Sequence, residues 1–167
     1  MKKQKGFSLI ELLIVVAIIL IIAAIAIPNL LRSRIAANEA SAVGSIRTLN
    51  TAQVTYNSTY PTVGFSSTLA ALGPGSNCAT PTSAGACLID NVLGCASAPC
   101  VKSGYTFNVN DATTTGGIVS AYELNGDPTA PGTSGVRYFC SNADAVVRTA
   151  AGSTTTQANC TAATPLQ

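Results

Sequence analysis

The sequence has no histidine, few charged residues and few aromatic residues. Only 10% of its 167 residues are charged and only 5% are aromatic. Histidine is the side chain that most often serves as a general base, and it is also a common zinc ligand, so the chain lacks both uses of it. It also has no nucleophile motif of the G-x-S-x-G type and no phosphate-binding glycine loop. Aromatic residues are too sparse to support an electron-conducting stack. These absences predict a protein that is not an enzyme.

The acidic residues beyond the first third of the chain do not form a recognisable ligand set. They are scattered, without the spacing of a metal-binding loop, at Asp90, Asp111, Glu123, Asp127 and Asp144. No metal and no cofactor is therefore expected. The net charge of +2 includes Lys2, Lys3 and Lys5, and without them six basic residues face seven acidic ones. Nucleic-acid binding is not expected from this balance.

Apolar residues are abundant but unevenly spread. They make up 47% of the chain, and many of the Ile, Leu and Val residues fall between Leu9 and Leu31. The length suits one compact domain with appendages rather than two domains. All six cysteines lie beyond the apolar segment: Cys78, Cys87, Cys95, Cys100, Cys140 and Cys160. Because there is no C-x-x-C pair and no histidine, disulfides in an oxidising compartment are favoured over a zinc site.

The N-terminus combines a short basic segment with a long apolar one. Residues 1–6 are polar and basic, and the run from Phe7 to Ile27 is interrupted only by Ser8 and Glu11. About 20 residues at about 1.5 Å per residue span about 30 Å, which is the thickness of the hydrocarbon core of a bilayer. A secretory signal is the alternative, but its apolar core is usually only about 7 to 15 residues long. We therefore predict a membrane helix, in which Glu11 needs a partner.

Helical periodicity resumes after Pro28 and changes character. The spacings predict one amphipathic face, because apolar residues recur three, four or seven positions apart. These residues are Ile35, Ala42, Ile46, Leu49 and Tyr56. Residues 57–59 and then Pro61 should end the helix, since proline disfavours helical geometry in the residue before it. The prediction is one very long helix whose second half packs a stripe against a globular head.

The rest of the chain predicts loops followed by short strands. Residues 61–103 are rich in proline, glycine and small polar residues, and four cysteines lie among them. Four strand-like segments follow, at residues 105–109, 118–124, 136–140 and 145–149. Hairpin turn signals lie between the first two at 116–117 and between the last two at 141–144. An antiparallel sheet packed on the helix stripe would account for both patterns, so the expected fold class is α+β.

The segment GFSLIELLIVVAIILIIAAIAIPN resembles the prepilin signature of type IV pilins and type II secretion pseudopilins. The resemblance covers about the first 55 residues. It implies that a membrane peptidase cuts between Gly6 and Phe7 and methylates the new amine of Phe7. It also implies that Glu11 is the acid which pairs with that amine on a neighbouring subunit during assembly. For Pro28 it leaves two interpretations open, a kink at the membrane exit or a segment that loses helicity on assembly.

The residues after Pro28 carry further expectations, the first from the basic residues themselves and the others from the resemblance. Arg32 and Arg34 are expected outside the membrane as interfacial anchors. Many pilins staple their C-terminal region, which implies a disulfide between Cys140 and Cys160. The nearest-neighbour pairs are then Cys78 with Cys87 and Cys95 with Cys100, although six cysteines permit fifteen connectivities. Some pseudopilins bind calcium, and Asp127 lies in a turn-like segment where that role competes with simple turn formation.

The expected product is a structural subunit of a type IV pilus-like filament with four regions. These are a cleaved leader (1–6), a membrane and filament-core helix (7–31), an amphipathic helix (32–60) and a globular head (61–167), with loops to 103 and a sheet from 104. Expected partners are further copies of the chain, the prepilin peptidase, the pilus assembly machinery and inner-membrane lipids. The subunit should wait in the inner membrane with a cytoplasmic leader and a periplasmic head, and then join a surface filament. A type II pseudopilin and a membrane-tethered binding protein that does not polymerise are the alternatives.

Overall fold

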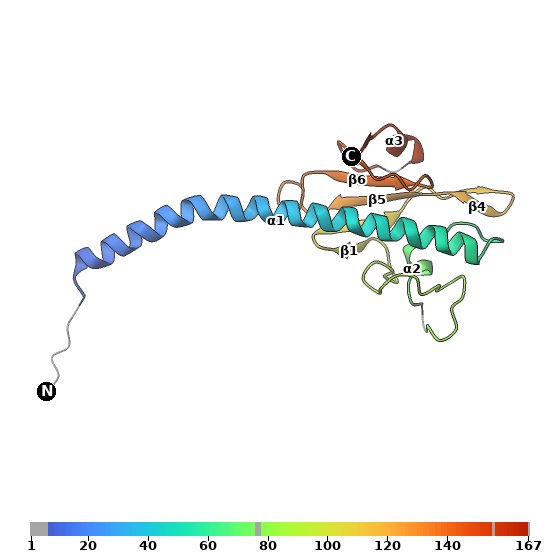
Figure 1. The fold of residues 1–167 in the computed structure, drawn as a ribbon, viewed down its shortest axis with the longest axis horizontal. Helices are drawn as coiled ribbons and strands as arrows, with labels where there is room; N and C mark the ends of the chain where they lie inside the picture. The colour runs from blue at the N-terminus through green and yellow to red at the C-terminus, as the bar shows by residue number, and fades with distance from the viewer. Residues whose placement is uncertain (1–6, 76–77, 155, 167) are drawn as a thin grey trace. The chain divides into compact units, whose positions relative to one another are not determined.

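The computed structural model describes residues 7–75, 78–154 and 156–166, and the chain divides into two compact units. The first unit ends at Arg34 and the second begins at Ile35. Helix α1 (Leu9–Thr59) continues across this boundary (Figure 1). The helix ends before Pro61, as the sequence predicted, and it contains Pro28.

The second unit joins the later part of α1 to an antiparallel sheet, which confirms the α+β prediction. Within the described residues the sheet has six strands in the order β1-β2-β5-β6-β7-β8, and β3 and β4 form a separate hairpin. The bounds are α2 (Leu69–Leu72), α3 (Gln157–Thr161), β1 (Cys100–Lys102), β2 (Tyr105–Val109), β3 (Thr113–Thr115), β4 (Ile118–Ala121), β5 (Glu123–Pro128), β6 (Tyr138–Asn142), β7 (Arg148–Ala150) and β8 (Thr164–Pro165).

The predicted stripe of α1 forms the helical side of the core. Ala42, Ile46 and Leu49 are fully buried and Tyr56 is nearly so, whereas Ile35 is only partly buried. Ile46 lies against β5 at Gly126, where an added Cβ would come within 3.1 Å of the Ile46 Cδ1 atom. The glycine thus lets the strand backbone approach the helix closely. The sheet contributes large buried side chains to the same core, namely Tyr105, Phe107, Tyr122, Leu124 and Phe139.

Three buried polar side chains of α1, at Glu39, Asn50 and Gln53, fix its position within the second unit. Glu39 accepts hydrogen bonds from the backbone amides of Val136 and Arg137, at 2.9 and 3.1 Å. Asn50 donates to a serine hydroxyl on β6, and Gln53 exchanges two hydrogen bonds with the backbone before α2. Because these partners are specific, they define the rotation and translation of the helix more sharply than apolar packing alone would.

The predicted strand at 118–124 is wrong in its extent, because the structure divides it into β4 and β5. β4 pairs with β3, whereas β5 pairs with β2 and β6. The chain passes from the hairpin to the sheet at Tyr122, which is fully buried against Phe65 at 4.9 Å between ring centroids. The turn at Gly116 and Gly117 consequently joins β3 to β4 rather than β2 to its sheet neighbour.

The last predicted strands are displaced for a different reason. Residues 136 and 137 use their amides to bind Glu39 of α1, so β6 begins at Tyr138 and runs to Asn142. Ala145 has a φ of 58° in the turn that follows, and β7 begins only at Arg148. The region expected to be loops contains α2 and β1, and the C-terminal elements α3 and β8 were not predicted.

Candidate functional site

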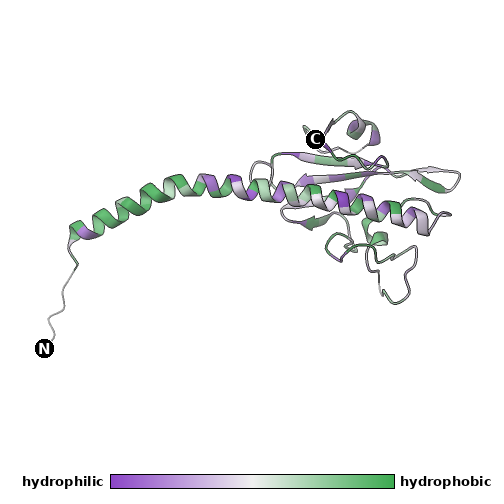
Figure 2. Ribbon diagram, viewed as in Figure 1, coloured by the Kyte–Doolittle hydropathy of each residue, from purple (hydrophilic) through white to green (hydrophobic). Residues whose placement is uncertain are grey.

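The first unit presents an apolar helix surface with almost no internal cover. From Phe7 to Arg34 every residue except the partly buried Ala23 is exposed, and the large apolar side chains are 46% to 87% exposed. Figure 2 shows this part of α1 as nearly continuously hydrophobic. By length and composition α1 is the one helix in the described part of the chain that could cross a membrane. A surface of this size requires lipid or protein to cover it.

Glu11 is the only charged residue between Phe7 and Leu31. Its Oε2 atom accepts a hydrogen bond from the Ser8 backbone amide at 2.8 Å, just before α1 begins at Leu9. Ser8 and Glu11 have the S-x-x-E spacing of a capping box, in which the acid satisfies an amide at the start of a helix. Sequence reasoning assigned Glu11 to assembly alone and missed this local role, although the spacing itself indicates it.

The other sequence-predicted residues of this segment are spread along the helix. Phe7 is 87% exposed, whereas Gly6 and the leader lie outside the described residues. Pro28 is helical and exposed, and so are Arg32 and Arg34 a turn or more beyond it. The described structure therefore holds Glu11 and Phe7 at one end of the apolar surface and the two arginines at the other end.

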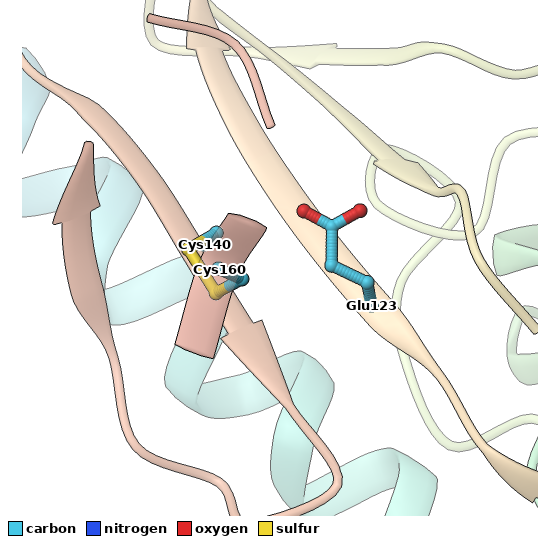
Figure 3. A group of neighbouring side chains, drawn as sticks. All are labelled: Glu123, Cys140 and Cys160. Carbon is cyan, nitrogen blue, oxygen red and sulfur yellow. A yellow bond between two sulfur atoms is a disulfide. The ribbon is translucent and has the colours of Figure 1, made fainter. Parts of the chain in front are cut away.

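The six cysteines form three disulfides, all in the second unit: Cys78–Cys87, Cys95–Cys100 and Cys140–Cys160. Cys140 and Cys160 are fully buried and fasten α3 to β6. Figure 3 shows Glu123 of β5 beside this disulfide, and one ligand atom from each of the three residues lies within 4.8 Å of the others. The group is not a metal site in this state, because both sulfur atoms are bonded to each other.

A polar face of β5 lies beneath the C-terminal segment. Glu123, Asn125 and Asp127 alternate with the core residues, and Glu123 is fully buried. Thr154 donates to Glu123 and Ser153 donates to Asp127. Among the described residues, each of the three side chains keeps one buried oxygen without a hydrogen-bond partner. Burial raises the pKa of Glu123 and of Asp127, and the hydrogen bonds to them oppose this rise only in part.

We expect the free energy of unfolding of the full chain in detergent to fall as the pH rises above the usual carboxyl range of about 4. The raised pKa of Glu123 means that the folded state still holds a proton which the unfolded state has already released. Stability from this group is complete below the unfolded pKa and is lost as the pH passes the folded pKa. Glu123→Gln keeps an acceptor for Thr154 but cannot titrate, so urea unfolding from about pH 4 to about pH 8 should show a smaller decline. Equal slopes in both proteins would contradict the prediction.

Two other carboxyl groups act in the opposite direction at lower pH, so they do not disturb this test. Burial alone would raise the pKa of Glu39, but hydrogen bonds from Val136 and Arg137 outweigh it and the pKa is lowered. The Arg148 side chain lowers the pKa of Asp144. Stability from these two groups is present above their usual pKa values and is lost only as the pH falls through the lowered ones.

Comparison with known proteins gives an N-terminal match. Residues 1–27 match the model of the prokaryotic N-terminal methylation motif. The N-terminal segment of the chain is also similar to segments of two type IV pilins and of a type II secretion system protein. The chain is 64% identical over 39 residues to the type IV wide pilus major component PilA4 of Thermus thermophilus, which covers 23% of this chain and 30% of that protein.

Two further curated proteins match over longer segments. The type IV major pilin protein PilA of Myxococcus xanthus is 46% identical over 54 residues, or 32% of this chain and 24% of that protein. The type II secretion system core protein G of Vibrio cholerae is 43% identical over 65 residues, or 37% of this chain and 44% of that protein. The chain thus spans less than half the length of these relatives. No solved structure matches it significantly.

Proposed function

We propose that this chain is the subunit of a type IV pilus-like filament. A membrane peptidase cuts the precursor between Gly6 and Phe7 and methylates the Phe7 amine. The subunit waits in the inner membrane, with its leader in the cytoplasm and its head in the periplasm, and the assembly machinery then adds it to a helical polymer. Pro28 lies in the segment of the helix that loses helicity when the subunit enters the polymer. The polymer extends from the cell surface.

The exposed apolar surface of residues 7–34, most of which lies within the matched methylation motif at residues 1–27, carries this proposal. In the membrane, lipid chains cover the surface before assembly. In the filament, the same side chains of neighbouring copies cover one another, and dispersion contacts between closely packed helices replace contacts with lipid. Lys2, Lys3 and Lys5 support the orientation, since basic residues next to a membrane helix favour the cytoplasmic side. The three disulfides fit a head in an oxidising compartment.

The contact that we propose between copies is an ion pair of Phe7 with Glu11. Cleavage leaves Phe7 with a protonated amine near Glu11, whose Oε2 atom is bound to the Ser8 amide. No described residue donates a hydrogen bond to the Oε1 atom. That oxygen can therefore accept from the Phe7 amine of a neighbouring copy, which neutralises both charges where water is excluded.

We expect intact-mass analysis of the subunit from sheared surface filaments to give a chain that begins at Phe7 and carries one added methyl group. Electron microscopy of the same material should show the filaments. Assembled protein that begins at Met1, or near Pro28 as after signal-peptide cleavage, would contradict the proposal. A chain found only in membranes, with the same processed N-terminus, would favour the membrane-tethered alternative.

A type II secretion pseudopilin is the second candidate, and the match to the Vibrio cholerae core protein G favours it. Both candidates use the same processing and the same helix, so the N-terminus cannot separate them. Deleting the gene should abolish surface filaments if the chain is a pilin. Loss of secreted enzymes with surface filaments intact would instead identify it as a pseudopilin.

A further inference from the structure

The head, which is the second unit from Ile35 onward, has very few charges that are both exposed and unpaired. Four of its charged residues are exposed: Arg47, Asp90, Arg137 and Asp144. Arg137 is paired with the buried Glu39, and Asp144 is paired with Arg148. Among the described residues this leaves Arg47 and Asp90 as the exposed charges without an ion-pair partner. One is positive and the other is negative.

Arg47 lies at the side of a groove on the head. The groove has a volume of about 490 Å³ and lies between the exposed side of α1 and the turn after β6, lined by Arg47, Asn50, Thr51, Val54, Thr55 and Ala145. Val54 is 54% exposed there, and the threonines offer hydroxyl groups. The groove therefore suits a short segment that carries one negative charge, one apolar side chain and polar backbone.

Asp90 lies in a loop that offers one negative charge, one exposed apolar side chain and polar backbone groups. Its Oδ1 atom accepts from the amides of Val92 and Leu93, at 3.2 and 2.8 Å, and no described residue donates to its Oδ2 atom. Val92 is 48% exposed beside it. The loop is rigid, because Gly94 packs directly on Gly73 and the Cys95–Cys100 disulfide follows at once. A rigid loop loses little conformational entropy on binding.

The groove and the loop belong to different faces of the same head. In Figure 1, β6 lies on one side of α1, whereas α2 and the loop after it lie on the other side. The segment that leads into the Asp90 loop is fixed to the α2 region, because the backbone amides of Ala86 and Leu88 donate to α2 carbonyl groups. A copy therefore cannot fill its own groove. A contact between two different patches of identical chains is head-to-tail, and when it does not close into a ring it produces an open helical filament.

We propose that the Asp90 loop of one copy docks in the Arg47 groove of the next copy in the filament. Asp90 Oδ2 meets the Arg47 guanidinium, and Val92 packs on Val54. This contact rests on the proposed function and deepens it, because it adds a contact between heads to the helix core. It sets the register between neighbouring heads through one complementary charge pair.

Charge reversal tests the contact in the full-length chain of the native strain. Arg47→Glu and Asp90→Arg each place like charges together, and each should reduce the filament protein in the sheared fraction by at least about tenfold. The double variant restores opposite charges with the polarity exchanged, and it should recover a clear part of the lost yield. Recovery stays below wild type, because arginine at position 90 cannot accept from the Val92 and Leu93 amides. Lys102→Glu, which reverses a partly buried cation on β1, is the control and should leave the yield unchanged.

A mixture of the two single variants provides a second test that does not need the double variant to fold. In a strain that expresses both chains, the two can alternate along the filament. The substituted loop of the Asp90→Arg chain then meets the substituted groove of the Arg47→Glu chain, and the unchanged loop of the second chain meets the unchanged groove of the first. Every contact joins opposite charges, so filaments should reappear although each variant alone fails.

Two results would overturn the proposed contact. One is a normal filament yield from both single variants, and the other is no recovery in either the double variant or the mixture. Absence of filaments from the wild-type strain would instead overturn the proposed function.

Discussion

A strain with Glu11→Ala is expected to hold a normal amount of subunit in its membranes and to make few or no filaments. The precursor should insert at least as well as wild type, because a carboxylate in an apolar segment opposes insertion by about 2.5 to 3.5 kcal/mol at mid-membrane. The head should be unaffected, since Glu11 belongs to the first unit and the head begins at Ile35. Assembly should fail because the Phe7 amine is buried without an opposite charge, at a cost of about 3 to 5 kcal/mol.

The hydrogen bond from Ser8 to Glu11 introduces a second explanation that the experiment must exclude. Glu11→Ala removes the capping interaction together with the charge, and a frayed first turn would be enough to impair assembly. Glu11→Gln separates the two effects, because glutamine can still accept from the Ser8 amide in a capping box but carries no charge. Filament loss in both variants identifies the charge as the cause. Normal filaments with Gln and none with Ala would identify the cap instead.

Leu12→Ala is the matched control for this pair of variants. Leu12 follows Glu11 directly and is 61% exposed, so its truncation perturbs the same turn of the helix without changing a charge. Filament counts, membrane-held subunit and the mass of the processed chain should be measured in all three strains. Abundant normal filaments in the Glu11→Gln strain would show that no ion pair at Glu11 is needed for assembly.

The helix could be predicted almost to the residue because its determinants are local. The run from Phe7 to Ile27 and the stop before Pro61 depend on chain composition and on proline geometry, which no distant contact overrides. The stripe of Ala42, Ile46 and Leu49 was equally visible, since a period of about 3.6 residues places these side chains on one face whatever covers them. These features needed no knowledge of the rest of the chain.

The sheet could be predicted in kind but not in register. Whether residues 118–124 form one strand or two depends on Tyr122, whose burial against Phe65 redirects the chain between the two partners of the segment. The start of β6 depends on Glu39, which lies 97 residues away from Val136. The uncovered groove beside Arg47 likewise needs Ala145 brought next to α1. Each feature joins positions far apart in sequence, and a local pattern carries no information about such a contact.

Removal of the Cys140–Cys160 disulfide is expected to destabilise the head by about 3 kcal/mol. The bond joins residues 20 apart, and in the chain-entropy model a loop of this size restricts the unfolded chain by about that amount. The helix that it fastens, α3, has only five residues. Hydrogen bonds from Asn142 to Gln157 and Thr161 hold it to β6, and Gln157 also donates to Asp111 and Thr113. A helix this short is not stable without such a constraint. The Tm of the full chain should therefore fall by roughly 10 °C.

The Cys95–Cys100 disulfide is the control, because its removal should destabilise the head less than removal of Cys140–Cys160. Its cysteines are only 5 residues apart, so the same model assigns it about 2 kcal/mol. Thermal unfolding of Cys140→Ala/Cys160→Ala and Cys95→Ala/Cys100→Ala in detergent should therefore rank the first pair as the more destabilising. The first variant should also become sensitive to protease between β7 and β8, because α3 is no longer fastened over Glu123. If both variants unfold at the same temperature, or the first retains full protease resistance, β6 holds the C-terminal segment without the disulfide.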